Sequence, residues 1–410
     1  MSAALIGFAV LFLGYSDSVR REWDFAVYYL AADALWSGKN PYDPHVLINI
    51  GKAVDGAGYE GLPYLYSPLF ARLLYPFTRL SYFDAAFAWM ALKCAALEWS
   101  LFSILMLLRL SPSWWSLALL NLGALFYRPI ALDFNAGNVA VFESALILGS
   151  LAAWRRKSSA AAPLLLAAGA IKGTPLLMLL YPIHRRDYPF LKSFAAAFAV
   201  LLFLLLLGYQ AVYQCYSFFH GPIWRTMWDE QVQSIYNCSS ITVLLRTFSE
   251  TYFSEPLYHS PFLTGLLIPL FPIMVFCLAA YGIYRRESHV EYENTDEKSL
   301  SIILLCLLLL PPRLAGYNLA LSFYPLVQIL FSAWREKRNA VLFIALIGLL
   351  FIQIDLRQIG IHKGHIKPGP IQLLIDKDFF GLLFLFIAAV TLCISKDFHR
   401  NSLDRSLEAK

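Results

Sequence analysis

The sequence carries little charge for its length. Only 15% of the 410 residues are Asp, Glu, Lys or Arg, whereas 59% are hydrophobic and the mean hydropathy is +0.57. A soluble domain of this size would need far more charge to cover its surface. The composition therefore excludes an ordinary soluble globular protein and indicates a protein that lies in a membrane.

The sequence also lacks the signatures of several common functional classes. It has no glycine-rich phosphate loop, no zinc-type spacing of Cys and His, and no RNA-binding motif. The net charge of +5 comes from short basic clusters between apolar runs, which is typical of membrane topology rather than of nucleic-acid binding. We expect no nucleic-acid partner and no cofactor. We also expect no metal, because the Asp-x-Asp pair formed by Asp376 and Asp378 lies outside the sequence blocks described below. Cys215 and Cys238 flank one polar loop, and the sequence leaves open whether they form a disulfide.

The sequence contains several long apolar runs. Residues 195–207, 266–281, 340–352 and 379–394 are, with their flanks, long enough to cross a hydrocarbon core of about 30 Å as helices. We expect an all-α polytopic membrane protein with about 10–13 transmembrane helices. No linker and no clear repeat divides it, so one transmembrane domain should span residues 1–394, followed by a cytoplasmic tail at 395–410.

The basic clusters predict the topology. Arg155, Arg156 and Lys157 follow an apolar run and should be cytoplasmic. We count membrane crossings from this cluster and take residues 114–132 as one spanning helix. The count places the polar stretches 16–81 and 214–260 outside the cytoplasm. The apolar run 3–13 lacks a basic region before it, so it is predicted to be a short first spanning helix rather than a signal peptide.

Residues 160–181 depart from a simple crossing because both ends of this apolar run are basic. Its middle contains Lys172, Gly173 and Pro175, and glycine and proline both interrupt helices. A lysine at membrane depth is costly and usually functional. The pattern predicts two half-helices that enter and return to the cytoplasmic side, with Lys172 near the turn.

The first outer stretch opens with Asp24 and a segment of helical apolar spacing at residues 25–37. The segment is too short to span, so we expect it to lie along the membrane surface. Gly38 and the Asn40-Pro41 pair end it. A carboxylate held there is well placed to meet a lipid-carried substrate.

Five sequence blocks in this order resemble glycosyltransferase family 87, over about residues 15–335. The blocks are Asp-Phe-x-x-Tyr-Tyr at 24–29 with Gly38 and Pro41-Tyr42-Asp43-Pro44, Tyr66-Ser67-Pro68, Ala136-Gly137-Asn138-Val139, Lys172-Gly173-Thr174-Pro175, and Asn237-Cys238-Ser239 with Arg246. Two departures stand out: Asn138 replaces a Gln, and residues 311–318 replace a His-containing block.

The resemblance implies a GT-C-like fold with an outward-facing site and a polyprenyl-phosphate sugar, with mannose as the leading candidate, as donor. The family's general base matches Asp24. The implied partners are this donor, a lipid or glycan acceptor and membrane lipids, in a bacterial inner membrane with the site facing the periplasm or exterior. A functional histidine of the family type is not carried over.

The residues themselves fit such chemistry. Asp24 is the candidate base, and Lys172, Arg246 and Arg313 are candidate ligands of the donor phosphate. Substrate contacts are assigned to aromatic and amide side chains. These are Tyr28, Tyr29, Tyr66, Asn138 and Asn237.

Several plainer readings stay open. Asp24 could serve only as a helix N-cap. The side chain of Lys172 could simply reach from the membrane to water without binding a substrate. Asp33 and Asp43 are weaker candidates for the base, and Arg128 is a further candidate for the phosphate. A transporter or flippase of polyprenyl-linked glycans, an inactive homologue, and a lipid-glycan polymerase or ligase are the competing functions. A transporter should show paired broken helices, whereas only one clear break is visible.

Overall fold

The computed structural model describes residues 24–54, 62–206, 211–218, 237–251, 255–287, 297–354 and 374–394. Within these ranges the chain is helical, and the single β-type pairing is an isolated antiparallel bridge between Asn237 and Ala315. The prediction of an all-α polytopic membrane protein is therefore confirmed. The expected first helix at 3–13 and the tail at 395–410 lie outside the described residues.

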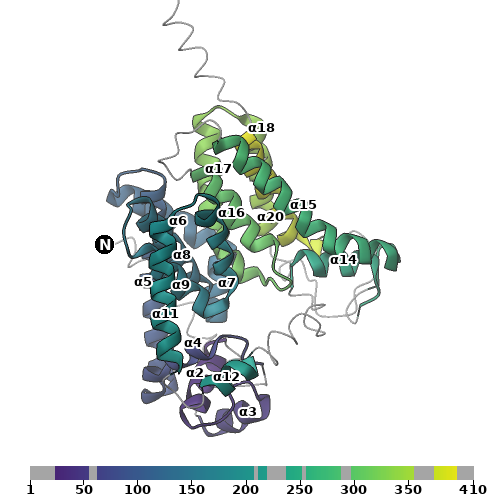
Figure 1. Ribbon diagram of the computed structural model, residues 1–410. Helices are drawn as coiled ribbons and strands as arrows, with labels where there is room; N and C mark the ends of the chain where they lie inside the picture. The colour runs from purple at the N-terminus through teal and green to yellow at the C-terminus, as the bar shows by residue number, and fades with distance from the viewer. Residues whose placement is uncertain are drawn as a thin grey trace, which may run out of the picture.

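Four short helices form a layer at one end of the molecule (Figure 1). They are α2 (Asp24–Trp36), α3 (Pro44–Ala53), α4 (Pro68–Leu73) and the 3-10 helix η1 (Tyr75–Arg79). We call these helices the loop layer, because they come from the first outer stretch. The short α12 (Ala211–Phe218) lies beside them.

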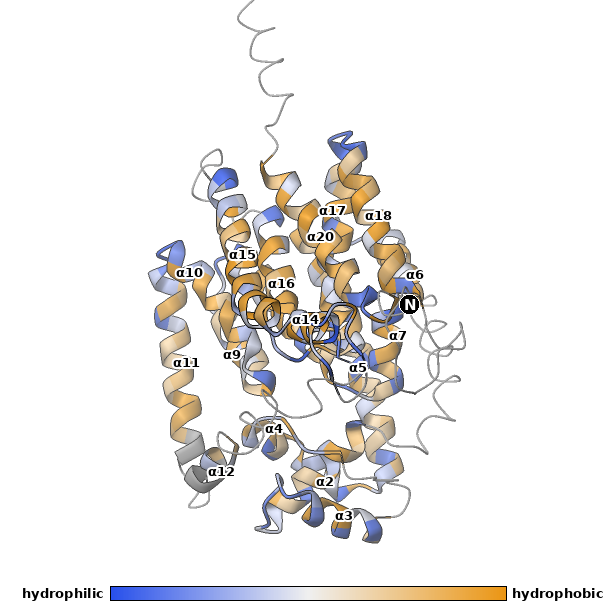
Figure 2. Cartoon of the chain, turned by 90° about the vertical axis from the view of Figure 1, so that its right-hand side faces the viewer, coloured by the Kyte–Doolittle hydropathy of each residue, from blue (hydrophilic) through white to orange (hydrophobic). Residues whose placement is uncertain are grey.

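The remaining helices make up the bundle, which is orange over most of its length in Figure 2. Its first half contains α5 (Tyr82–Leu107), α6 (Trp114–Phe126), α7 (Arg128–Ala136), α8 (Ala140–Arg155), α9 (Ala161–Lys172), η2 (Thr174–Leu179), α10 (Leu180–His184) and α11 (Tyr188–Leu206). Its second half contains α14 (Ser240–Phe248), α15 (Pro261–Glu287), α16 (Glu297–Leu309), η5 (Gly316–Ser322), α17 (Phe323–Arg335), α18 (Asn339–Gln353) and α20 (Lys377–Ile394).

Three of these helices, α5, α15 and α20, are long and apolar enough to cross a membrane. The pair α6–α7 would be a fourth span, but it is bent by 70°. We expected one continuous helix here. Tyr127 has an extended backbone and Pro129 sits in the first turn of α7, where its missing N–H is tolerated, so the chain starts a new helix. Shorter apolar helices include residues 161–172, 188–203 and 339–353, and the count of about 10–13 spans stays a prediction.

Helix α2 differs from the expectation of a surface helix. Its side chains from Phe25 to Leu35 are buried except for Asp33, so protein rather than membrane covers it. The physical reason is its composition, since an apolar helix without a polar stripe is stable only when it is buried on all faces. Phe25 stacks on Trp89 of α5, with ring centroids 5.2 Å apart, which attaches the loop layer to the bundle.

The predicted hairpin at 160–181 is present. Helix α9 ends at Lys172, Gly173 has a positive φ of 46°, and η2 and α10 lead the chain back. At the far end, Trp154 Nε1 donates to Asp187 at 2.6 Å, so the start and the end of the hairpin lie on the same side of the bundle. A Cβ atom on Gly169 would overlap the side chain of Leu176, so glycine permits the close packing of α9 against η2.

The basic clusters close several helices at the end of the bundle opposite the loop layer (Figure 2). Arg109, Lys157, Arg186 and Lys337 each have a positive φ just after α5, α8, α10 and α17. Cations at helix C-termini interact favourably with the exposed carbonyl groups. The predicted cytoplasmic clusters and the loop layer therefore occupy opposite ends of the fold.

Candidate functional site

Asp24, the first residue of α2, meets the turn between α7 and α8. Asn138 Nδ2 donates to Asp24 Oδ2 at 2.7 Å. Asn138 Oδ1 accepts from Val139 N at 2.7 Å, which fixes the orientation of the amide so that its NH₂ group faces the carboxylate. Asp24 itself is partly buried. The sequence placed these two residues in separate blocks, and the tertiary structure joins them.

Two tyrosines surround the same amide. The hydroxyl groups of Tyr28 and Tyr66 each lie 3.1 Å from Asn138 Nδ2, and Tyr28 donates to Tyr66 at 2.8 Å. Their rings meet edge to face at 4.8 Å. Two of the predicted substrate-binding tyrosines therefore lie beside the predicted base.

Lys172 approaches from the turn of the hairpin. Its Nζ atom is 3.1 Å from Glu143 Oε2 of α8 and donates to Asn318 Oδ1 of η5 at 2.8 Å. It also lies 5.5 Å from the centre of the Tyr66 ring, a cation–π contact. Ser67, the N-cap of α4, donates to the carbonyl of Ala170, so the loop layer is tied directly to the end of α9.

The divergent block 311–318 forms another wall of the site. Tyr317 is close enough to Asp24 and Arg313 for their charges to act on its phenol. Arg313 Nη1 is buried and makes no hydrogen bond within the described part of the chain. An unsatisfied guanidinium donor is available for an anionic ligand.

The electrostatics favour a proton-accepting carboxylate with an upward-shifted pKa. Burial raises the pKa of Asp24 from its ordinary value, while the Asn138 hydrogen bond and the charge of Lys172 act in the opposite direction. Burial also raises the pKa of Tyr28 and Tyr66 well above the usual value, so both remain neutral hydrogen-bond donors and acceptors.

Three of the predicted site residues lie elsewhere. Tyr29 is buried and donates to the carbonyl of Leu80 at 3.0 Å. Arg246 is fully buried, forms an ion pair with Asp376 and donates to the carbonyl of Asn237. These contacts give Tyr29, Asn237 and Arg246 structural partners away from Asp24.

Asn237 belongs to the contact between the 237–239 segment and the 312–315 segment. Its Nδ2 donates to the Pro312 carbonyl at 3.2 Å, and its Oδ1 accepts from Leu314 N at 2.9 Å. It thereby supports the block that carries Arg313 and Tyr317 without itself reaching Asp24.

The alternative candidates are placed as follows. Asp43 is the N-cap of α3 and accepts from His45 N at 2.9 Å. Arg128 is paired with Asp378 at 3.1 Å and donates to the carbonyl of Ile352 at 3.1 Å. Cys215 and Cys238 are both free, so the disulfide left open by the sequence is not formed.

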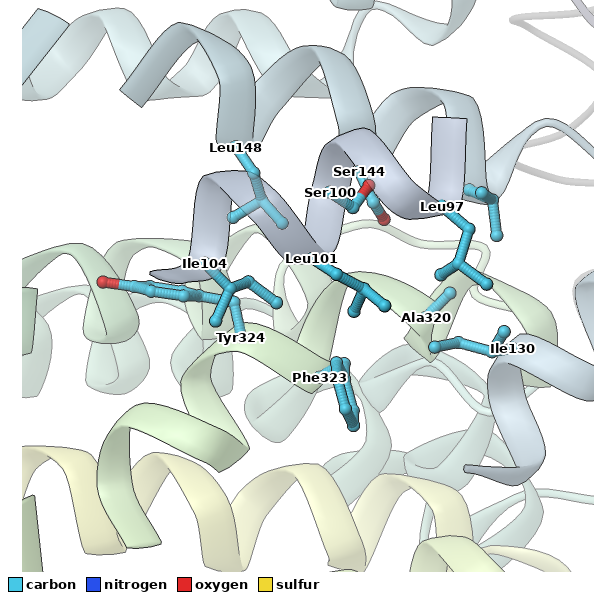
Figure 3. A pocket seen from close by; sticks show the side chains of 11 residues that line it. Leu97, Ser100, Leu101, Ile104, Ile130, Ser144, Leu148, Ala320, Phe323 and Tyr324 are labelled. Atoms are coloured by element: carbon cyan, nitrogen blue, oxygen red, sulfur yellow. The ribbon is translucent and has the colours of Figure 1, made fainter. Parts of the chain in front are cut away.

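Two cavities lie between helices of the bundle. One, of about 10 Å³, is enclosed by α5, α7, α8 and the η5–α17 segment, where Leu101, Ile130 and Phe323 converge (Figure 3). It is large enough for about one water molecule and is too small for a sugar. The other is an apolar groove of about 210 Å³ between the η2–α10 segment, α15 and α16, and Leu177 and Leu310 are among its lining residues.

No group of three or more His, Cys, Asp or Glu side chains is arranged to hold a metal ion in the described ranges. The site contains two carboxylates, Asp24 and Glu143, together with hydroxyl and amide groups and cations.

A comparison with known families decides the broader identity, because the profile of glycosyltransferase family 87 matches residues 64–312. The chain belongs to glycosyltransferase family 87. No curated protein and no solved structure matches the chain. As a family member with apolar spanning helices, the protein is a membrane glycosyltransferase. The matched region includes Tyr66, Asn138 and Lys172, whereas Asp24 precedes it.

The sequence-based interpretation missed Glu143 and the roles of Tyr317 and Asn318. Glu143 is a carboxylate inside an otherwise mostly apolar run, and such a charge is itself a sign of function or pairing. Tyr317 and Asn318 lie in the block that departs from the family pattern, where no resemblance could assign them.

Proposed function

We propose that this family 87 glycosyltransferase moves a hexose, with mannose as the leading candidate, from a polyprenyl-phosphate carrier to a hydroxyl group of a lipid or glycan acceptor. The observation that carries the proposal is the convergence of one partly buried carboxylate, Asp24, with Lys172 and Arg313 around Tyr66 and Tyr317. Such a site can accept a proton at one point and stabilise an anion at another.

In the proposed reaction the acceptor oxygen attacks the anomeric carbon of the donor. Asp24 takes the hydroxyl proton as the new C–O bond forms, and the bond between the anomeric carbon and the phosphate oxygen breaks. Polyprenyl phosphate leaves with the bonding electron pair. A single base without a covalent partner predicts inversion at the anomeric carbon, by analogy with inverting glycosidases.

Lys172 and Arg313 are the proposed phosphate ligands. The Lys172 ammonium has three protons, and Glu143 and Asn318 engage two of them. One proton remains for a phosphate oxygen. Arg313 has an unsatisfied buried donor, whereas the charge of Arg246 is balanced by Asp376. We therefore favour Arg313 over Arg246 for this role.

The carrier chain fits the apolar groove described above. Leu177 lines it five residues after Lys172, and Leu310 lines it three residues before Arg313, so a groove residue lies close in the chain to each proposed phosphate ligand. Ala279 and Ala280 leave space on the α15 side. An isoprenoid chain would bury its apolar surface there without any polar requirement.

The arrangement of the two ends of the fold supports a proposal for the side of the membrane that the site faces. Helix α2, which begins at Asp24, lies with the rest of the loop layer at the end of the fold opposite the hydrophilic helix ends drawn blue in Figure 2. Basic residues follow several of those helices, and basic clusters as a rule remain cytoplasmic. We therefore propose a non-cytoplasmic site, facing the periplasm or exterior of a bacterial inner membrane.

The decisive experiment compares Asp24→Asn with Asp33→Asn, a matched change on the same helix. Each purified protein receives radiolabelled polyprenyl-phosphate mannose and a lipid extract. We expect the wild type and Asp33→Asn to form a labelled product, and Asp24→Asn to lose at least about 100-fold in rate while remaining folded. A wild type that transfers no label from mannose, glucose or arabinose donors would refute the proposal, and full activity of Asp24→Asn would refute the base.

A second experiment tests the groove. Ala280→Trp should fill it and raise KM for a long-chain donor more than for a donor with a short prenyl chain. An equal effect on both donors would show that the chain lies elsewhere. Leu119→Trp on the exposed face of α6 is the control, because that side chain faces outward.

A further inference from the structure

A buried ion pair lies directly behind the turn that carries Asn138. Lys93 of α5 and Asp133 of α7 are fully buried, and Lys93 Nζ lies 2.7 Å from Asp133 Oδ2. The same Nζ donates to the backbone carbonyls of Asp133 at 2.6 Å and Asn138 at 2.8 Å. The ammonium is thus held at both ends of one short segment, by the carboxylate and carbonyl of Asp133 and by the carbonyl of Asn138.

The segment that Lys93 holds is the link between α7 and α8. Gly137 has a φ of 64°, which ends α7, and its carbonyl accepts from Trp89 Nε1 at 3.0 Å. Asp133 Oδ1 accepts from Ala140 N at 3.0 Å and so satisfies the start of α8. Trp89 and Lys93 are one helical turn apart on α5 and contact the same turn.

Asn138 projects from this fixed turn toward Asp24. Its backbone carbonyl is bound by Lys93, and its side-chain amide donates to the carboxylate. A buried ion pair is costly to form from solvated ions and often adds little stability compared with apolar residues. Burying Lys93 and Asp133 next to the Asp24 partner is therefore better explained by the geometry that it imposes than by stability alone.

We propose that Lys93 and Asp133 are positioning residues for the base, holding the turn so that Asn138 donates to Asp24. The inference rests on the proposed role of Asp24. Neither residue touches the substrate in this proposal, and both act through Asn138. Without the pair the turn relaxes, the amide moves away from the carboxylate, and Asp24 loses the hydrogen bond that favours its ionised form.

The direction in which the pKa of Asp24 changes when the ion pair is removed distinguishes a positioning role from a simple charge effect. The groups that act on Asp24 come from several elements, namely Lys93, Asp133, Lys172, Tyr28, Tyr66 and Tyr317. The charge of Asp133 raises the pKa of Asp24 and the charge of Lys93 lowers it. Removing both charges therefore removes two opposing effects, whereas losing the Asn138 hydrogen bond should raise that pKa.

The test is an infrared titration of the Asp24 carboxyl group in the full-length protein, with Asp24→Asn as the blank, together with kcat. In the double variant Lys93→Met/Asp133→Asn, the amide oxygen introduced by the second substitution can still accept from Ala140 N. We expect the Asp24 midpoint to rise by about one pH unit and kcat to fall about 10-fold. Asn138→Ala should give the same rise, and adding it to the double variant should give no further shift.

Trp89→Phe supplies a variant without a change of charge, in case the double variant does not fold. It removes the donor to Gly137 and should raise the midpoint by a smaller amount. A midpoint that stays the same or falls in these variants, with only thermal stability reduced, would overturn the inference. A wild type without transferase activity would refute the proposed function instead, and the titration would still decide whether the pair positions Asp24.

Discussion

Replacement of Lys172 by methionine tests whether its ammonium stabilises the departing phosphate. Methionine keeps the approximate length of the side chain but removes the ammonium that contacts Glu143 and Asn318. If Lys172 stabilises the departing phosphate, one lost cationic donor should reduce kcat by about 100- to 1,000-fold, or roughly 3–4 kcal/mol. Lys192→Met on α11, where the lysine is exposed, should change neither rate nor stability.

The same substitution should also destabilise the fold. Breaking a buried pair costs about 3–5 kcal/mol. The Lys172 side chain is 23% exposed and Glu143 is 11% exposed, and Glu143 can take up a proton. We therefore expect a smaller loss of about 1–3 kcal/mol in the free energy of unfolding. This loss should appear as a lower midpoint in urea unfolding of the detergent-solubilised protein.

The double variant Lys172→Met/Glu143→Gln decides between the two effects. It removes both charges, so stability should return to within about 1 kcal/mol of the wild type. The rate should stay low, because the phosphate has still lost its ligand. Recovery of both stability and full activity would refute the reasoning, since Lys172 would then act only as the partner of Glu143.

Three further predictions concern other parts of the molecule. Transfer should fall as the pH drops through the raised pKa of Asp24, because the protonated carboxyl cannot accept a proton; a pH profile of kcat/KM should show its acid limb above pH 3.8, and a limb at or below that value would contradict the assignment. Burial raises the pKa of Asp376 from 3.8 to about 6 despite its ion pair with Arg246, so the folded state binds its proton more tightly than the unfolded state and this group's contribution to stability declines as the pH rises between these values. Asp376→Asn should remove that part of the pH dependence in thermal unfolding, and an unchanged curve would count against it. Gly169→Val should destabilise the hairpin by about 1–3 kcal/mol, and Leu176→Ala in the same chain should restore part of the loss; if it restores none, the overlap is not the cause.

The sequence predicted the class of the fold because its signals are strong and local. The apolar runs that became α15 and α20 are long enough to be identified without tertiary information. The hairpin at Lys172 followed from basic residues at both ends and from Gly173 and Pro175 within. Both are consequences of what a lipid bilayer tolerates along a single segment.

The errors arose where neighbouring elements decide the outcome. Helix α2 was expected on the membrane surface, but the loop layer and α5 cover it. The α6–α7 segment was expected to be one helix, yet it bends by 70° at the residues before Pro129. Apolar periodicity does not tell a helix that faces lipid from one that faces protein.

For the candidate site, the residue types and their division into blocks can be identified from the chain alone, with Asp24, Asn138 and Lys172 in distinct blocks. Tertiary packing brings these three together around Tyr66 and pairs Arg246 with Asp376. The same packing places Lys93 and Asp133 behind Asn138. The physical reason is that hydropathy and helix signals act over a few residues, whereas hydrogen bonds and ion pairs join groups that packing brings together from far apart in the chain, such as Asn138 and Asp24, which are separated by 114 positions.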